Sequence, residues 1–120
     1  MSSRLNDDDA ELSIETRKEG AAMVVSPRGD VTAFSSPALR GVLRQAAQDR
    51  PARLVVDLSA TRYIDSSGVA TLVEALQNVR RYKGMLVLAG ASPRVRGILE
   101  IARLDGLFNM AADVGQALAN

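Results

Sequence analysis

Four adjacent residues near the middle of the chain, Asp65, Ser66, Ser67 and Gly68, have the types and spacing from which chemistry can be built. A serine hydroxyl acts as a nucleophile when a neighbouring base removes its proton, and as a phosphoryl acceptor when a kinase supplies the phosphate. The chain has 120 residues and contains no histidine and no cysteine. The commonest general base and all thiolate chemistry are therefore missing from it.

An enzyme with a serine nucleophile needs a base within hydrogen-bond reach. Only Lys18, Lys83 or a carboxylate could supply one here, so we expect no catalytic residues and no enzymatic activity. Metal sites and cofactors are not expected either, because the preferred nitrogen and sulfur ligands are absent and no phosphate-binding G-x-x-x-x-G-K motif is present.

The Asp65 to Gly68 motif follows an apolar strand and precedes an amphipathic helix, which is where sites gather in α/β proteins. One interpretation is structural: Asp65 or Ser66 caps the helix, a contribution of about 1 kcal/mol. The other is phosphorylation. A serine in the first helical turn faces unpaired amides and the positive end of the helix dipole, so the fold should tolerate a phosphate there. Composition and spacing do not decide between the two.

The elements that position this motif are predicted from hydrophobic periodicity and from turn signals. Period-two or apolar runs predict strands at 12–16, 21–26, 53–59, 85–90 and 107–112. Helices are expected from Ser36 as N-cap with Pro37 first, from the motif to Gly84, from Ser92 with Pro93 first, and from Asp113. Pro27 should lie at a sheet edge or where the second strand ends.

This order predicts one α/β domain over residues 11–120, a mixed and mostly parallel β-sheet of four to five strands packed with about four α-helices. Residues 1–10 are polar and acidic and are expected to form a disordered tail. They do not resemble a signal peptide, and no apolar run approaches the ~20 residues of a membrane span. We therefore expect a cytoplasmic protein.

The composition gives no sign of a nucleic-acid or membrane partner. The formal net charge is +1 and aromatic residues make up 3% of the chain, so neither a charge excess nor a stacking platform for bases is present. We expect no direct nucleic-acid binding, no membrane binding, and a monomer when the protein is free.

Three stretches together resemble the STAS-domain anti-sigma factor antagonists, which are bacterial partner-switching proteins. The stretches are "LVVDLSATRYIDSSGVATLVEAL" (54–76), the glycine-acidic turn "RGDVTAFSSPALR" (28–40) and "MLVLAGASPRVRGILEIARLDGLF" (85–108). The resemblance covers roughly Leu12 to Leu118 and implies a STAS fold.

The resemblance also implies a mechanism. In such proteins the second serine of the motif, here Ser67, is phosphorylated by an anti-sigma factor that is itself a serine kinase. The dephosphorylated antagonist binds that kinase and frees the sigma factor, and a PP2C-type phosphatase reverses the modification. Asp65 and Ser66 map onto the loop that flanks the acceptor, and Gly68 onto a helix-entry glycine that permits close approach. Val69, an apolar residue near the helix start, is a further candidate for partner contact.

One position departs from the family pattern. Many members carry an aspartate near the acceptor where this chain has Thr32, and Asp30 is the nearest carboxylate. An aspartate would orient the hydroxyl and later repel the phosphate, whereas Thr32 can only form hydrogen bonds. Thr32 either belongs to the site or is a turn residue that satisfies local backbone.

An alternative function stays open. A constitutive STAS subunit, such as an accessory of a lipid-transport ATPase or a scaffold in a stress-signalling complex, would dock through the same loop without phosphate turnover. Many such subunits lack an acceptor serine.

Overall fold

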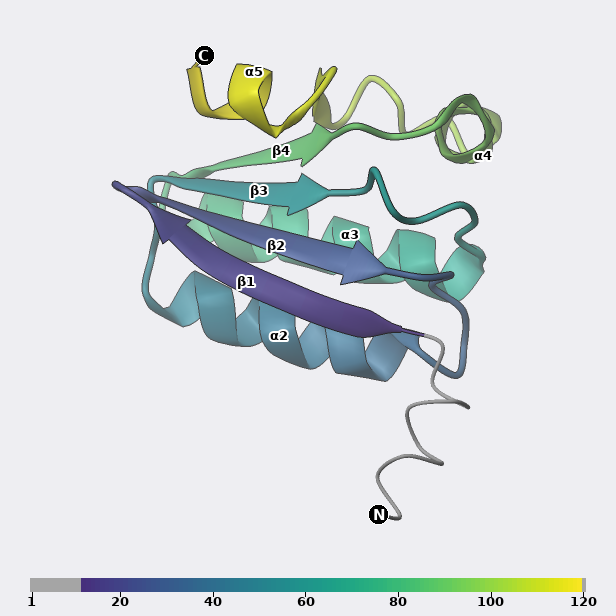
Figure 1. The fold of residues 1–120 in the computed structure, drawn as a ribbon, viewed down its shortest axis with the longest axis horizontal. Coiled ribbons are helices and arrows are strands. Elements are labelled where there is room, and N and C mark those ends of the chain that lie inside the picture. Colours follow the sequence, from purple (N-terminus) through teal and green to yellow (C-terminus); the bar gives the residue numbers. More distant parts are fainter. Residues whose placement is uncertain (1–11, 120) are drawn as a thin grey trace.

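The computed structural model describes residues 12–119, which form one mixed sheet with helices on both faces (Figure 1). The sheet has the strand order β1-β2-β3-β4-β5; β1 is antiparallel to β2, and the remaining pairs are parallel. The strands are β1 (Ser13–Glu19), β2 (Ala22–Arg28), β3 (Arg53–Asp57), β4 (Met85–Ala89) and β5 (Asn109–Ala111). The helices are α2 (Ser36–Gln48), α3 (Ser66–Arg81), α4 (Pro93–Ile101) and α5 (Val114–Ala119).

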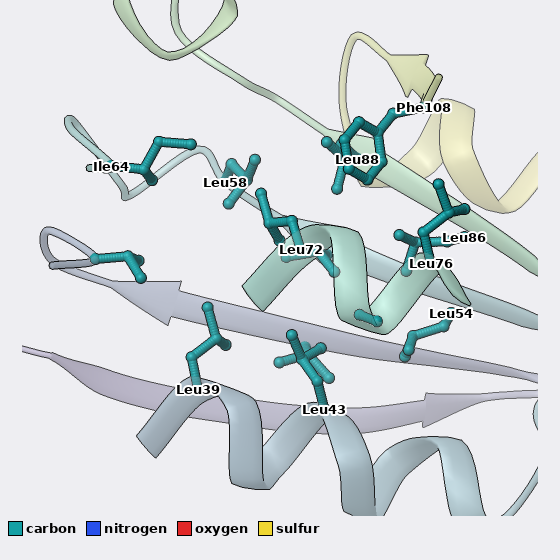
Figure 2. Packing of buried hydrophobic residues seen from close by; sticks show 14 of the residues in the cluster. Leu39, Leu43, Leu54, Leu58, Ile64, Leu72, Leu76, Leu86, Leu88 and Phe108 are labelled. Atoms are coloured by element: carbon teal, nitrogen blue, oxygen red, sulfur yellow. The ribbon is translucent and has the colours of Figure 1, made fainter. Parts of the chain in front are cut away.

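The larger part of the core lies between the sheet and α2, α3 and α4. Leucines at helical spacing, Leu39 and Leu43 on α2 and Leu72 and Leu76 on α3, meet the buried side chains of β3 and β4 (Figure 2). Burial of each such side chain stabilises the fold by roughly 1.5 to 3 kcal/mol. This packing fixes the start of α3, and with it the serine motif, against the sheet.

The opposite face of the sheet carries a smaller core. Val24, Val55 and Val87 of three neighbouring strands pack with Ala117 of α5. Valines on both faces of the central strands explain why β3 reads as an almost continuous apolar run.

The predicted class and every predicted strand and helix are confirmed within the described residues. Pro27 lies near the end of β2, beyond the part paired with β3, where a missing N–H breaks no bond between those two strands. Ser92 caps α4 by accepting from the Val95 amide, and Asp113 accepts from the Gln116 amide at the start of α5.

One predicted cap is wrong. The N-cap of α2 is Ser35, and Ser36 is the first helical residue. The reason lies in the loop just before the helix: the Ser35 hydroxyl accepts from the Thr32 amide and donates to the Asp30 carbonyl, while the Ser36 amide donates to the Thr32 carbonyl at 2.7 Å. These bonds close the loop one residue earlier than the Ser-Pro pattern suggests.

The expected acidic tail at residues 1–10 lies outside the described residues. Between residues 12 and 119, no helix combines the length and the apolar character that crossing a membrane requires.

Candidate functional site

The serine motif lies where two loops meet beyond the carboxyl ends of β2 and β3. Val31, which follows β2, forms an isolated parallel bridge with Ile64, which follows β3. The Val31 amide donates to the Tyr63 carbonyl, and the Asp65 amide donates to the Val31 carbonyl, both at 3.0 Å. The two loops are therefore held together by backbone bonds just before α3 begins.

Asp65 is the N-cap of α3, so the capping interpretation is confirmed for this residue. One carboxylate oxygen accepts from the amides of Ser67 at 2.8 Å and Gly68 at 3.1 Å. The other accepts from the Ala33 amide, 32 residues away in the first loop, at 3.0 Å. One carboxylate thus caps the helix and ties the loop after β2 to it.

The amides expected to be free for a phosphate are not free. Those of Ser67 and Gly68 donate to the Asp65 carboxylate, and that of Val69 donates to the Asp65 carbonyl at 2.9 Å. The expectation of unpaired amides is wrong for these three residues, because the cap takes two of them and the first helical bond takes the third.

Gly68 lies at a close approach of the chain to itself. A Cβ there would meet the Val31 carbonyl oxygen and the Ile64 Cβ, each at 3.0 Å. Close approach of a partner at Gly68 stays a prediction, because the groups that approach it in this structure are the chain's own backbone and side chains. Glycine is what allows the start of α3 to sit on the bridge between the two loops.

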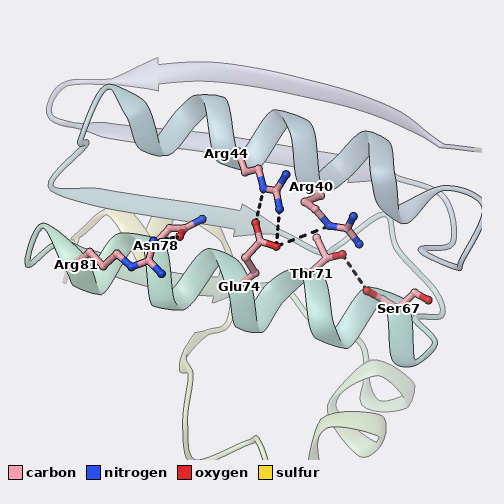
Figure 3. A network of polar contacts seen from close by, with 7 residues as sticks. All are labelled: Arg40, Arg44, Ser67, Thr71, Glu74, Asn78 and Arg81. Carbon is pink, nitrogen blue, oxygen red and sulfur yellow. Dashed lines mark hydrogen bonds and ion pairs between the residues drawn. The ribbon is translucent and has the colours of Figure 1, made fainter.

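The two serines face different surroundings. Ser66 is exposed and lines an apolar hollow of about 490 Å³ together with Val69, Ile98 and Ile101. Ser67 is half-buried, and its carbonyl accepts from the buried Thr71 hydroxyl at 2.9 Å, on the side of α3 that faces α2 (Figure 3). A phosphate would enter a different environment on each serine.

Thr32 forms hydrogen bonds within the loop that follows β2. Its hydroxyl accepts from the Phe34 amide at 3.2 Å, and its carbonyl accepts from the amides of Ser35 and Ser36. Asp30 contributes its carbonyl to the Ser35 hydroxyl, and its side chain is exposed. These contacts support the turn interpretation of Thr32.

Sequence reasoning missed two exposed apolar side chains beside the motif. Phe34, next to the tethered Ala33, is 93% exposed, and Ile101, at the edge of the hollow, is 86% exposed. A phenylalanine in a turn between a glycine and two serines is the sequence signal that could have identified the first. Ile101 lines the hollow together with Val69 and Ile98, and a contiguous exposed apolar patch commonly marks a binding surface.

Neither Lys18 nor Lys83 lies near enough to Ser67 to act as its base in nucleophilic catalysis. Lys83 lies beyond the far end of α3, sixteen residues on and roughly 24 Å along the helix axis. Lys18 lies opposite Met23 in the β1–β2 ladder, next to the turn between the two strands. Each of the two lysines borders a hollow at the amino-terminal edge of the parallel strands, the edge opposite to Ser67. The Asp65 carboxylate is occupied by three amides.

Comparison with known proteins supports this assignment of the fold. A family model described as STAS domain matches residues 13–117. An anti-sigma-B factor antagonist of Staphylococcus aureus is 28% identical over 99 residues, covering 82% of this chain and 92% of the relative. The corresponding protein of Listeria monocytogenes is 26% identical over 110 residues, covering 91% and 96%.

Solved structures share the fold. An anti-sigma factor antagonist from Mycobacterium paratuberculosis superposes with a TM-score of 0.84 at 24% identity, covering 92% of this chain and 93% of that one. The antagonist SpoIIAA in its unphosphorylated form gives 0.77 at 18% identity, covering 88% and 93%. A sulfate transporter family protein from Wolinella succinogenes gives 0.73 at 21% identity, covering 86% of each chain.

Proposed function

The chain belongs to the STAS domain family, and from this premise we propose that it is an anti-sigma factor antagonist switched by phosphorylation of Ser67. Unphosphorylated, it binds an anti-sigma factor that is a serine kinase and thereby releases the sigma factor. Phosphorylation by that kinase ends the complex, and a PP2C-type phosphatase restores it. The protein acts in the cytoplasm, has no catalytic activity of its own and is a monomer when free.

The observation that carries this proposal is the way Asp65 presents the serine pair. The carboxylate holds the α3 start and the loop after β2 in one fixed arrangement through three amide bonds. A kinase substrate held this way needs little ordering when it binds, which favours a protein that presents a hydroxyl to a partner. The names of the curated relatives agree with this role.

The transfer itself requires only the serine of this chain. The Ser67 Oγ attacks the γ-phosphorus of kinase-bound ATP, the bond from that phosphorus to the β-phosphate bridging oxygen breaks, and ADP leaves. The hydroxyl proton passes to a base on the kinase.

The partner surface combines the hollow with the two exposed apolar side chains. Phe34 lies beside the tethered end of the first loop, and Ile101 borders the hollow lined by Ser66 and Val69. An interface core needs desolvated apolar anchors, and these flank the motif. Asp65, Gly68 and Thr32 support this surface from within, and the exposed Asp30 is a further candidate for partner contact.

A direct test is phosphate transfer from ATP by the anti-sigma serine kinase of the source organism. Wild type and Ser66→Ala should be labelled and Ser67→Ala should not; labelling of Ser67→Ala would refute the assignment. Ser66 is the matched control because it is the adjacent residue and the more exposed of the two.

Binding is tested on the same kinase without ATP. Phe34→Ala and Ile101→Ala should each weaken binding about tenfold or more, as truncated anchors do. Met85→Ala, an apolar residue 42% exposed at the opposite edge of the sheet, is the control and should bind like wild type.

The constitutive-subunit alternative rests on the transporter-related structural neighbour. It predicts that baits of wild type, Ser67→Ala and Ser67→Asp recover the same partners equally from a lysate of the source organism. Our proposal predicts that the first two retain the kinase and that Ser67→Asp loses it.

A further inference from the structure

A polar stripe runs along the side of α3 that faces α2 (Figure 3). Its α3 members recur at intervals of three or four residues and so share one helix face, and two arginines of α2 oppose them. We call this set the α2–α3 polar stripe, and it consists of Ser67, Thr71, Glu74, Asn78 and Arg81 with Arg40 and Arg44.

Glu74 is shared unequally by the two arginines. Arg44 donates to both of its carboxylate oxygens, from Nε at 2.5 Å and from Nη2 at 3.1 Å. The Nε of Arg40 lies 3.8 Å from the Glu74 Oε1, an ion pair without a hydrogen bond. The hydrogen bond from Arg44 is the main reason that the pKa of Glu74 is lowered. Arg44 therefore satisfies the carboxylate, and Arg40 is only loosely held.

Arg40 lies on the Ser67 side of Glu74. Along the α3 axis in Figure 3, its guanidinium is drawn between Glu74 and Ser67, level with Thr71, whose hydroxyl is bonded to the Ser67 carbonyl. Ser67 and Thr71 are four residues apart, or about 6 Å along the helix axis. The Ser67 hydroxyl points away from Arg40 in Figure 3, so the two side chains meet by a change of rotamer, which the long arginine side chain and the added phosphate both allow.

Two amides at the start of α3 are not free for a phosphate on Ser67. The Ser67 and Gly68 amides are bonded to the Asp65 carboxylate, which also repels a second anion. On the α2 side the charged groups facing it are Glu74, Arg44 and Arg40, of which Arg40 is the cation without a hydrogen-bonded partner in the stripe. The guanidinium fork suits two phosphate oxygens.

We propose that Arg40 is the phosphate-binding residue of this protein: after phosphorylation of Ser67 it leaves Glu74 to Arg44 and pairs with the phosphoserine. The inference rests on the proposed function only in taking Ser67 as the modified residue. Phosphorylation then rearranges charge on the surface between α2 and α3 while the backbone at the motif stays as it is.

The test is a pH titration of the phosphate by ³¹P NMR. Phosphoserine is placed at position 67 during translation, by suppression of an amber codon, so no kinase is needed. A nearby cation favours the doubly charged phosphate, so the second phosphate pKa in wild type should lie about half a pH unit below that in Arg40→Gln. Arg40→Lys keeps the charge and should restore most of the difference.

Arg81→Gln is the matched control. Arg81 belongs to the same stripe, but it is fourteen residues beyond Ser67, or about 21 Å along α3, and is bonded to Asn78. Its removal should leave the phosphate pKa of wild type unchanged. Equal pKa values in wild type and Arg40→Gln, or equal rises in Arg40→Gln and Arg81→Gln, would overturn the assignment. Coincident thermal unfolding of the unphosphorylated variants checks that both retain the fold.

The two proposals fail separately. If the kinase labels Ser67 and the titration ignores Arg40, the switch stands without this phosphate-binding residue. If the kinase labels another residue, the titration of translationally placed phosphoserine still reports whether Arg40 binds it.

Discussion

Replacement of Asp65 tests how the serine motif is held. This carboxylate accepts from two amides of α3 and from the Ala33 amide of the first loop. Loss of an N-cap costs about 0.5 to 2 kcal/mol, and we expect a cost near the upper end of this range for a charged cap that accepts from two amides. Loss of the Ala33 bond adds about 1 kcal/mol. We therefore expect Asp65→Ala to lower the free energy of unfolding by about 3 kcal/mol.

Asp65→Asn separates the two roles. Asparagine caps helices as well as aspartate does and keeps one oxygen for the amides of Ser67 and Gly68. Its side-chain NH₂ can only donate, so it cannot accept from the Ala33 amide. The expected loss is about 1 kcal/mol, the worth of the bond between the loops alone. Hydrogen exchange at the Ala33 amide should accelerate in this variant.

Urea unfolding followed by circular dichroism measures both losses. Ser92→Ala is the matched control, because Ser92 caps α4 through a single bond to the Val95 amide and bonds no second loop in this way. Its cost should be about 1 kcal/mol. If Asp65→Ala costs no more than Ser92→Ala and Asp65→Asn matches wild type, the carboxylate does not tie the two loops together.

Three further expectations concern α3. Gly68→Ala should lower the melting temperature, because overpacking of about 1 to 3 kcal/mol at the 3.0 Å contacts outweighs the helix propensity of about 1 kcal/mol that alanine adds; an unchanged melting temperature would contradict the close approach. Glu74→Gln should reduce the fall in the free energy of unfolding at acid pH. Because Arg44 lowers the pKa of Glu74 in the folded state, the ion pair stabilises the fold fully above the ordinary glutamate pKa, and this contribution is lost as pH falls through the folded-state pKa. The same loss of unfolding free energy at acid pH in wild type and Glu74→Gln, measured by urea titration, would refute this expectation. Burial raises the pKa of Tyr82, whose hydroxyl donates to the Pro51 carbonyl at 3.0 Å. Its stabilisation is present below the ordinary tyrosine pKa and lost as pH rises through the folded value, so Tyr82→Phe should cost about 1 kcal/mol at neutral pH and weaken the alkaline fall in stability.

The fold was predictable because its signals are local. Alternation at Leu12 and Ile14, the valine-rich run of β3 and leucines at helical spacing each report the surroundings of one segment. Ser92 followed by Pro93 likewise identifies the start of α4 from adjacent residues alone. These signals specify element type and order, and an alternating order of strands and helices leaves few ways to build the sheet.

The details of the site were less predictable because they depend on contacts between distant segments. The Asp65–Ala33 bond joins residues 32 apart, and the Arg44–Glu74 pair joins residues 30 apart. The cap of α2 was missed for a different, local reason: either Ser35 or Ser36 satisfies the pattern for a cap, and bonds of Ser35 to residues three and five positions earlier decide between them. Met85, in the apolar run that forms β4, is exposed because it begins that strand at the edge of a hollow, and the run itself does not separate it from its buried neighbours.

The geometry of the serine pair bears on how a charge mimic at Ser67 should be interpreted. An aspartate carries one charge and is shorter than phosphoserine, which carries about −1.5 to −2 charges on three oxygens. Ser67→Asp can therefore repel a partner that covers the motif, but it reaches less far toward Arg40 across the turn to Thr71. If Arg40 pairing contributes to switching, phosphoserine at 67 should exclude the kinase more completely than Ser67→Asp does. This difference in kinase exclusion between phosphoserine and aspartate should disappear in the Arg40→Gln background. If repulsion alone operates, the difference should stay the same or grow, because removing a cation leaves the phosphate charge uncompensated.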